Sequence, residues 1–355
     1  MASLVAELIE RHDRARFDVT GISFGPDDGS ALRARMMHGF DRFIDVRSES
    51  DRAVAQRLAE LEIDIAVDLM GHTRDNRLGI LAYRPAPLQV SFLGYPGPTG
   101  ADFIDYVVAD ATVLPRDRQP YWTERIVHLT GCYQANDSLR PIPDARPSRV
   151  ECGLPEQGFV FCCFNNNYKI SPDIFAIWMR LLAAVPGSVL WLLRDNDDAA
   201  RRLAAEAAAH GVDPARLIFA PVAGPEHHLA RHRQADLFLD TLPYNAHTTA
   251  SDALRMGLPV LTCPGESFAA RVAASLLTAL DMPELIVPDL ASYEALALAL
   301  ATDPARLSAI KQKLLRNAAG AALFDGDRFR IGLEAAYERM VARSRAGLPP
   351  EGFAV

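Results

Sequence analysis

Short apolar runs alternate along the chain with stretches whose apolar residues have helical spacing. Runs of this length are typical of strands that are buried on both faces of a sheet. Strands are expected at 17–24, 63–69, 88–93, 104–109 and 125–129 in the first half, and at 159–164, 188–194, 216–221, 237–241, 259–263 and 284–287 in the second. Strands that alternate with helices in this way predict an α/β protein with doubly wound, Rossmann-like parallel sheets.

Helix signals lie between the expected strands. Ser171 precedes a proline, which combines a capping hydroxyl with a residue suited to the first turn. Gly211 ends an alanine-rich helix at 197–210, and Thr248 or Thr249 opens another helix. After residue 290 the pattern is helical to the end of the chain, at 291–302, 304–318 and about 327–344.

The start of the chain has the pattern of a helix, because Leu4, Val5, Leu8 and Ile9 recur with helical spacing before the expected strand at 17–24. A βαβ unit normally places a strand before its first helix. The spacing leaves two interpretations open. One is an ordinary N-terminal helix, and the other is a lobe that lacks its first strand and loop.

A proline-rich stretch at 140–158 separates the two halves, and its prolines disfavour a continuous helix or strand. A chain of 355 residues is also long for a single core. We therefore expect two facing lobes, the first over 1–145 and the second over 159–325. Residues 146–158 would form the linker and 326–355 a C-terminal helix and tail, with the C-terminal helices closing the second lobe.

Composition narrows the function classes. Apolar residues make up 49% of the chain and charged residues 23%, which is the balance of a soluble globular protein. The net charge of −8 argues against a nucleic-acid partner, and no apolar run has the length of a membrane span. Glu7 and Glu10 interrupt what would be the core of a signal peptide. Five cysteines without CxxC spacing fit reduced thiols, so we expect a cytoplasmic protein with neither disulfides nor a metal site. The adjacent Cys162 and Cys163 are expected in the core.

The loops that follow the expected strands carry the candidate chemistry, because ligands of open parallel sheets bind at the carboxyl ends of the strands. Thr248 and Thr249 at a helix start offer hydroxyls and free N–H groups to an anion. Asp252, one turn later, could accept hydrogen bonds from a ribose. The alternative is a capped helix whose Asp252 complements the helix dipole.

Lys169 follows the expected strand at 159–164 and is one of only three lysines among 37 basic residues. A compact ammonium at this place suits a diphosphate, although a solvated loop lysine is the alternative. His227 and His228 are adjacent, so their side chains diverge on a helix, and stacking on a base is a better interpretation than metal binding. No dinucleotide fingerprint, P-loop or nucleophile elbow is present.

Several motifs in one order resemble a known family. They are FGPDDGS (24–30), GHTRDNR (71–77), the stretch 81–110 around LGYPGPTG, FNNNYKISP (164–172), PGSVLWLL (186–193), DTLPYNAHTTASDALRMGLPVLT (240–262) and PGESFAARVAASLL (264–277). Together they resemble the catalytic region of the O-linked N-acetylglucosamine transferases and their SPINDLY relatives, from about residue 17 to 340. The resemblance implies a GT-B fold and an inverting, metal-independent enzyme without a cofactor. Its donor would be UDP-N-acetylglucosamine, and its acceptor a Ser or Thr hydroxyl on a protein or peptide.

The resemblance also implies roles for individual residues. Lys169 would hold the β-phosphate and stabilise the departing UDP, with His247 beside the sugar and phosphates. Thr248 and Thr249 would bind the diphosphate, and Asp252 the ribose hydroxyls. The remaining assignments are His228 stacked on uracil, Ala223 at the uracil edge, Arg231 on the uridine side, Asn166 near the phosphates, and Leu93 and Gly94 lining the sugar pocket.

Departures from the family pattern suggest two alternatives. Family members carry a strand and a loop with an Asp and a His-Pro-Thr segment before the first helix, and these residues have no counterpart here. One alternative is therefore a nucleotide-sugar-binding module with little or no catalysis. Pro225 stands in place of a lysine, and His72 in place of a tyrosine of animal members. The other alternative is a protein O-fucosyltransferase that uses GDP-fucose, as SPINDLY relatives do.

Overall fold

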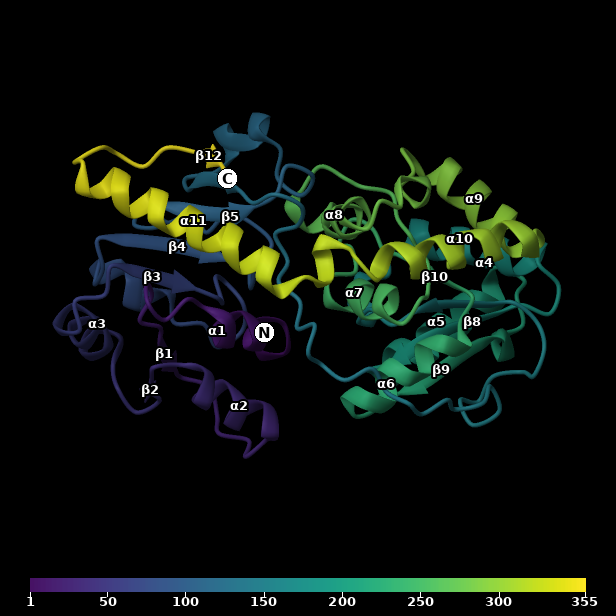
Figure 1. The fold of residues 1–355 in the computed structure, drawn as a ribbon. Coiled ribbons are helices and arrows are strands. Elements are labelled where there is room, and N and C mark those ends of the chain that lie inside the picture. Colours follow the sequence, from purple (N-terminus) through teal and green to yellow (C-terminus); the bar gives the residue numbers. More distant parts are fainter. The chain divides into compact units, whose positions relative to one another are not determined.

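Two units, each with its own parallel sheet, make up the computed structural model, which describes residues 1–355 (Figure 1). The first unit comprises residues 1–140 and 322–355, and the second comprises 141–321. Both units have the α/β architecture that the sequence predicts. The first boundary lies close to the predicted end of the first lobe at residue 145.

The first unit contains a five-stranded sheet in the order β12-β6-β5-β4-β3 and a separate two-stranded sheet of β1 and β2. All pairs are parallel. The strands are β1 (Thr20–Ser23), β2 (Arg42–Asp45), β3 (Ile65–Asp68), β4 (Leu88–Phe92), β5 (Tyr106–Ala109), β6 (Arg125–His128) and β12 (Phe353–Ala354). The helices are α1 (Ala2–Arg11), α2 (Ala31–Gly39), α3 (Asp51–Glu60) and α11 (Gly326–Arg345), with short 3-10 turns at Leu78–Tyr83, Arg116–Tyr121 and Ala322–Phe324.

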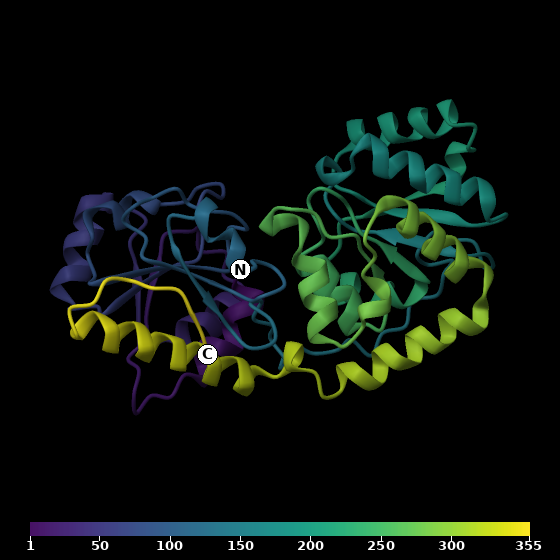
Figure 2. The same cartoon turned by 90° about the horizontal axis from the view of Figure 1, so that it is seen from above.

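Helix α11 packs on the first unit. Leu333, Ala336 and Met340 lie in one buried cluster with Val90 of β4 and Val127 of β6. Figures 1 and 2 both show α11 running along the sheet of this unit. The prediction that the C-terminal helices close the second lobe holds for α9 and α10 and is wrong for α11. An apolar helical stripe has the same period whichever sheet it covers, so the pattern could not choose between the sheets.

The second unit is built on one parallel sheet in the order β11-β10-β7-β8-β9. Its strands are β7 (Val160–Cys163), β8 (Val189–Arg194), β9 (Leu217–Pro221), β10 (Leu237–Leu239) and β11 (Val260–Leu261). Every residue of the central strand β7 is buried, as its unbroken apolar sequence predicts. Cys162 and Cys163 are therefore core residues, and burial raises the pKa of the Cys163 thiol to about 12. All five cysteines are free thiols.

Capping residues set the starts of several helices in the second unit. Ser171 accepts from the Ile174 N–H at the start of α4, Asn196 caps α5, and Asp303 caps α10. The helices are α4 (Pro172–Ala184), α5 (Asp197–Ala209), α6 (Pro225–Arg231), α7 (Thr248–Arg255), α8 (Val272–Ala279), α9 (Leu290–Thr302) and α10 (Pro304–Ala318). Short 3-10 turns occur at Asn167–Lys169, Pro214–Arg216, His232–Gln234, Phe268–Ala270 and Pro283–Leu285.

The structure differs from the sequence-based expectation at three strands. The strand expected at 284–287 is reduced to a single bridge between Thr262 and Ile286, because prolines flank this short run and interrupt a ladder. Strands β2 and β12 were not predicted, since they are short and their residues are partly exposed. The chain is accordingly not helical to its end.

The proline-rich segment belongs to the second unit rather than standing apart from it. Residues 141–158 contain no helix or strand, as expected. The Arg149 guanidinium nevertheless donates to the Asp236 carboxylate (2.9 Å), and Arg233 donates to the carbonyls of Pro143 and Ala145. These bonds anchor the predicted linker to the body of the second unit.

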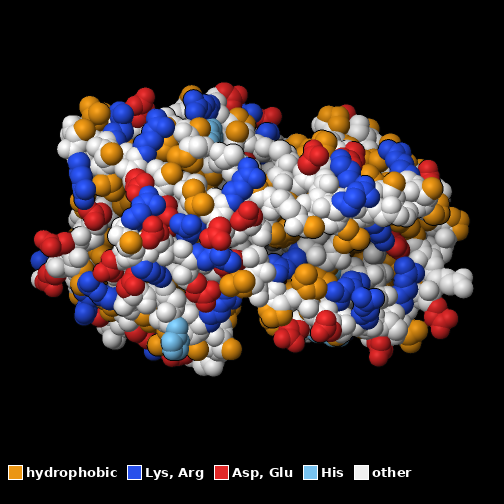
Figure 3. Space-filling model, viewed as in Figure 1, with side chains coloured by type: hydrophobic (Ala, Val, Ile, Leu, Met, Phe, Trp, Pro, Cys, Tyr) orange, Lys and Arg blue, Asp and Glu red, His pale blue; other side chains and the backbone are white.

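The surface of the units is mixed in charge. Acidic and basic side chains lie side by side over the face in Figure 3. None of the helices combines the length and the apolar character that a membrane-spanning segment needs.

Gly94 follows β4 at a point where two backbone segments nearly touch. A Cβ atom at this position would lie 1.7 Å from the carbonyl oxygen of Leu69, so only glycine fits. The neighbouring Leu93 adopts a positive φ of 66°. This tight turn sets the path of the loop that carries both predicted sugar-pocket residues.

We expect Gly94→Ala to lower the free energy of unfolding by about 3 kcal/mol, because the Leu69 backbone has to move away from the new methyl group. Urea denaturation measures this change. Gly25→Ala is the control, since Gly25 has no atom near its Cβ position and an ordinary φ. Equal stability of the two variants would contradict the packing argument.

Candidate functional site

The loops after β7 and β10 meet at the carboxyl edge of the second sheet. The two strands are neighbours in that sheet, and polar segments follow both. The Asn165 side-chain amide donates to the Thr241 hydroxyl (2.7 Å), and the Lys169 ammonium donates to the Asn245 carbonyl (2.8 Å). These two hydrogen bonds fix one loop against the other.

Lys169 is largely buried between these loops. Its ammonium lies 3.8 Å from the centre of the Tyr244 ring, in cation–π contact, and it donates to the Asn245 carbonyl. Burial lowers the pKa of Lys169 to about 8, and the negative charge of the nearby Asp240 carboxylate opposes this effect. The side chain is therefore a cation at neutral pH, with little water around it.

Helix α7 begins beside this lysine. Its first two residues, Thr248 and Thr249, have N–H groups that donate to no group of the chain, whereas the N–H groups of Ala250 and Ser251 donate to the His247 carbonyl. The Thr249 hydroxyl donates to the Asn165 side-chain oxygen, which ties the helix start to the loop after β7. Free N–H groups at the positive end of a helix dipole, close to an ammonium, form a site for an anion.

His247 immediately precedes this helix and is neutral. Burial and the Lys169 charge lower the pKa of His247 to about 3. Its Nε2 lies 3.3 Å from the Ala269 carbonyl oxygen, which can only accept, so Nε2 carries the proton. The Nδ1 atom is consequently an acceptor, and the ring adds no positive charge to the site.

A second cluster lies around the start and the end of α6. The Arg231 guanidinium is buried over the Phe164 ring, 4.4 Å from its centre, and donates to the Pro221 carbonyl and to Nδ1 of His228. Because a guanidinium only donates, Nε2 of His228 carries the proton. The His228 ring lies 5.3 Å from Phe164 and 4.8 Å from His232. Arg231 thus orients the half-buried His228 ring.

The other predicted site residues lie at other positions in the fold, as follows. Asn166 is exposed next to Asn165, and Ala223 lies in the loop between β9 and α6. Asp252 is nearly buried, one turn into α7. Leu93 and Gly94 belong to the first unit. The structure thus brings Lys169, His247, Thr248 and Thr249 together, and the individual roles assigned to all these residues stay predictions.

Sequence reasoning missed three residues that build the site, namely Asn165, Asp240 and Tyr244. Asn165 and Asp240 are completely or almost completely buried; Asp240 directly follows β10, and Asn165 comes two residues after the end of β7. Their position at the carboxyl edge was the available signal, because a polar residue in a buried strand end needs partners. Tyr244 gave no signal, since its contact with Lys169 depends on the path of the loop.

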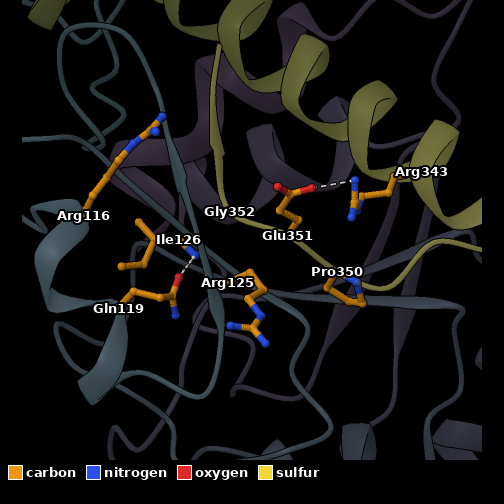
Figure 4. A pocket seen from close by; sticks show the side chains of 8 residues that line it. All are labelled: Arg116, Gln119, Arg125, Ile126, Arg343, Pro350, Glu351 and Gly352. Atoms are coloured by element: carbon orange, nitrogen blue, oxygen red, sulfur yellow. Dashed lines mark hydrogen bonds and ion pairs between the residues drawn. The ribbon is translucent and has the colours of Figure 1, made fainter.

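A cavity of about 410 Å³ opens elsewhere, in the first unit. It is lined by Arg116, Arg125 and Arg343 (Figure 4), and Arg343 pairs with Glu351 at 2.7 Å. The guanidinium groups of Arg116 and Arg125 point away from one another in Figure 4, so their charges do not converge on one point. No group of three or more His, Cys, Asp or Glu side chains is arranged to hold a metal ion.

The family model of glycosyl transferase family 41 matches residues 2–146 and 141–333. The chain belongs to this family. The resemblance to O-linked N-acetylglucosamine transferases and SPINDLY proteins, predicted from the motifs, is thereby confirmed. Family 41 membership also agrees with the two-unit α/β architecture.

Named relatives support the same assignment. The family 41 chain is 37% identical over 361 residues to the probable UDP-N-acetylglucosamine–peptide N-acetylglucosaminyltransferase SEC of Arabidopsis thaliana, covering 100% of this chain and 37% of SEC. It is 35% identical over 303 residues to the Arabidopsis SPINDLY protein, covering 83% of this chain and 32% of SPINDLY. The chain thus spans about a third of the length of these relatives.

Solved structures confirm the fold class. A mutant of the O-GlcNAc transferase from Thermobaculum terrenum is 33% identical and superimposes with a TM-score of 0.88, covering 96% of this chain and 65% of the other. The Anabaena protein HepE, solved with UDP, is 14% identical with a TM-score of 0.64, covering 95% of this chain and 96% of the other. That second likeness concerns the fold alone. The family 41 chain has Rossmann-like units of the GT-B type.

We expect Asn165→Ala to lower the free energy of unfolding by about 2 kcal/mol, because it removes the partner of two threonine hydroxyls in a buried place. Urea denaturation measures the change. Asn166→Ala is the matched control, since the Asn166 side chain is exposed and makes no hydrogen bond, and we expect an effect within about 0.5 kcal/mol. Similar losses in both variants would show that Asn165 does not join the two loops.

Proposed function

We propose that this chain is the catalytic region of a glycosyltransferase that moves N-acetylglucosamine from UDP-N-acetylglucosamine to Ser or Thr hydroxyls of proteins. The reaction would invert the anomeric carbon and use no metal ion or other cofactor. Family 41 membership and the names of the relatives SEC and SPINDLY support the donor and the peptide acceptor.

One observation carries the proposal: Lys169 lies against the loop that leads into the free N–H groups of Thr248 and Thr249. The Lys169–Asn245 and Asn165–Thr249 hydrogen bonds join the ammonium and the helix start into one positive site. A diphosphate has two charged phosphoryl groups. The Lys169 ammonium can bind one of them, and the backbone N–H groups of Thr248 and Thr249 can bind the other.

The positive site has a role in the chemistry. As the acceptor hydroxyl oxygen bonds to C1 of the sugar, it gives up its proton to solvent, the bond from C1 to the β-phosphate oxygen breaks, and the electron pair of that bond stays on UDP. Negative charge therefore grows on the diphosphate in the transition state. A cation and a helix terminus that are already in place stabilise this charge without rearrangement. Neutral His247, next to them, can accept a hydrogen bond from a sugar hydroxyl at Nδ1 without adding charge.

The nucleoside would bind on the α6 side of the site. The His228 ring, oriented by Arg231, offers a face for stacking on a base, and the backbone at Ala223 offers groups for the base edge. Asp252 would accept hydrogen bonds from the ribose. A base held by stacking and backbone groups would leave the diphosphate directed toward Lys169 and α7.

We expect Lys169→Met to lower the transfer rate about a thousandfold, because the departing diphosphate loses its one side-chain cation. Transfer of labelled sugar to a peptide measures the rate, and thermal unfolding shows that the fold is kept. Lys313→Met is the control, since Lys313 pairs with Glu284 at the surface. Full transfer by the Lys169 variant would contradict the proposal. Calorimetry with UDP and GDP in parallel tests separately whether the donor carries uridine or guanosine.

The pH dependence of the wild-type protein follows from Lys169. Its pKa of about 8 in the free protein means that the ammonium is charged below this pH and neutral above it. We expect kcat/KM for the donor to fall up to tenfold per pH unit above about pH 8. His247, with its pKa near 3, adds no change between pH 5 and 9. A profile that stays flat up to pH 10 would contradict a role for the Lys169 charge.

A further inference from the structure

Asp240 is a completely buried carboxylate at the end of β10, and the proposed chemistry does not use it directly. One of its oxygens accepts from the backbone N–H groups of Thr241 (2.8 Å) and Ala246 (2.6 Å). The other accepts from the hydroxyl of Thr262 (2.6 Å), which follows β11. A carboxylate offers about four acceptor sites, so three donors satisfy most of them in a place without water.

These hydrogen bonds close a loop. Thr241 and Ala246 are the first and last residues of the segment after Asp240, so one carboxylate oxygen holds both ends of it. The segment carries the Tyr244 ring and the Asn245 carbonyl, which are the two groups in contact with the Lys169 ammonium. The position of the ammonium therefore depends on Asp240 through the loop.

The carboxylate also acts by its charge. Burial raises the pKa of Asp240 to about 7, against the opposing effects of its three hydrogen bonds and of the positive charge of Lys169, the nearby cation. Reciprocally, Asp240 raises the pKa of Lys169 against burial. The other titratable groups around the pair are Cys163 on β7, Cys263 after β11, Tyr293 on α9 and His247 before α7.

None of these neighbours can replace Asp240 as the counter-charge. Burial raises the pKa values of the Cys163 and Cys263 thiols and of the Tyr293 hydroxyl, so these groups are uncharged near neutral pH. The His247 ring is neutral as well. The Tyr293 hydroxyl donates to the backbone carbonyl of Asp240 (2.9 Å) and not to its carboxylate. The carboxylate accepts from Thr241, Ala246 and Thr262.

We propose that Asp240 is a positioning residue of the transfer site, whose carboxylate fixes the loop that holds Lys169 and supplies the buried negative charge that keeps the ammonium protonated. Its importance for transfer rests on the proposed function, whereas its effect on Lys169 does not. Asp240 itself touches neither the nucleotide nor the sugar in this assignment.

The variant Asp240→Asn separates charge from shape. Its side-chain oxygen can still accept from Thr241 and Ala246, and its NH₂ group can donate to the Thr262 hydroxyl, which also accepts. The loop is thereby kept while the charge is removed. If the charge acts as proposed, the Lys169 pKa falls. If Asp240 only held the loop and the loop opened, Lys169 would become hydrated and its pKa would rise toward the ordinary value.

The scarcity of lysine makes a direct measurement possible. Protein labelled with ¹³C at lysine Cε gives three signals, which Lys311→Arg and Lys313→Arg assign. We expect the Lys169 titration midpoint to lie about one pH unit lower in Asp240→Asn than in the wild type. A midpoint that stays the same or rises overturns the proposal.

Asp236→Asn is the matched control. Asp236 directly precedes β10 and pairs with Arg149 and Lys311, so the same charge is removed at the other end of the same strand. We expect the Lys169 midpoint to be unchanged in this variant. An equal fall in both variants would mean that the effect is not specific to Asp240, and would also overturn the proposal.

Two further measurements complete the test. If Asp240→Asn does not fold, Thr262→Val is used in its place. The carboxylate then loses one donor, so it is charged over a narrower pH range. We expect the Lys169 midpoint to fall by a smaller amount than in Asp240→Asn. A midpoint that stays or rises there overturns the proposal. In an active protein, the alkaline limb of kcat/KM moves with the Lys169 midpoint. Absence of any transfer would refute the proposed function, while the lysine titration would still decide the role of Asp240.

Discussion

A cation buried at the end of a parallel sheet has to be held by something other than water, and this constraint shapes the second unit. Lys169 loses most of its hydration, which costs free energy. A backbone carbonyl, an aromatic face and a buried carboxylate compensate for that loss. All three come from the loop that follows β10: Asp240 begins this loop, and Tyr244 and Asn245 lie within it. The position of one loop thus decides whether the site has its charge.

The arrangement explains why so many buried polar side chains gather at one sheet edge. Asn165, Thr241 and Asp240 are buried, yet each has hydrogen-bond partners in the network. Such networks are rigid when every member is satisfied, and a rigid site is one that needs no rearrangement as charge develops. The first unit has the same class of architecture, but the cavity lined by Arg116, Arg125 and Arg343 lacks a comparable convergence of charges.

Much of the fold could be predicted from the sequence, because alternating apolar runs and capping residues are local signals. Ten of the eleven expected strands occur, and α4, α5, α7, α9, α10 and α11 lie where the pattern predicts them. Lys169 and the start of α7 were recognised from their places after strands. The contacts of Tyr244 and Asp240, and the sheet that α11 covers, depend on tertiary packing, which no local spacing encodes.

The return of α11 to the first unit means that the chain passes between the units twice, once after residue 140 and once after residue 321. A single backbone cut in either connection leaves the pieces joined by the other. Deleting the C-terminal end also strips the first sheet of Leu333, Ala336 and Met340, and so exposes an apolar surface prone to aggregation. The first lobe therefore cannot be isolated by simple truncation, whereas the second is one continuous segment, 141–321. A separately folding first lobe would need its two segments spliced together.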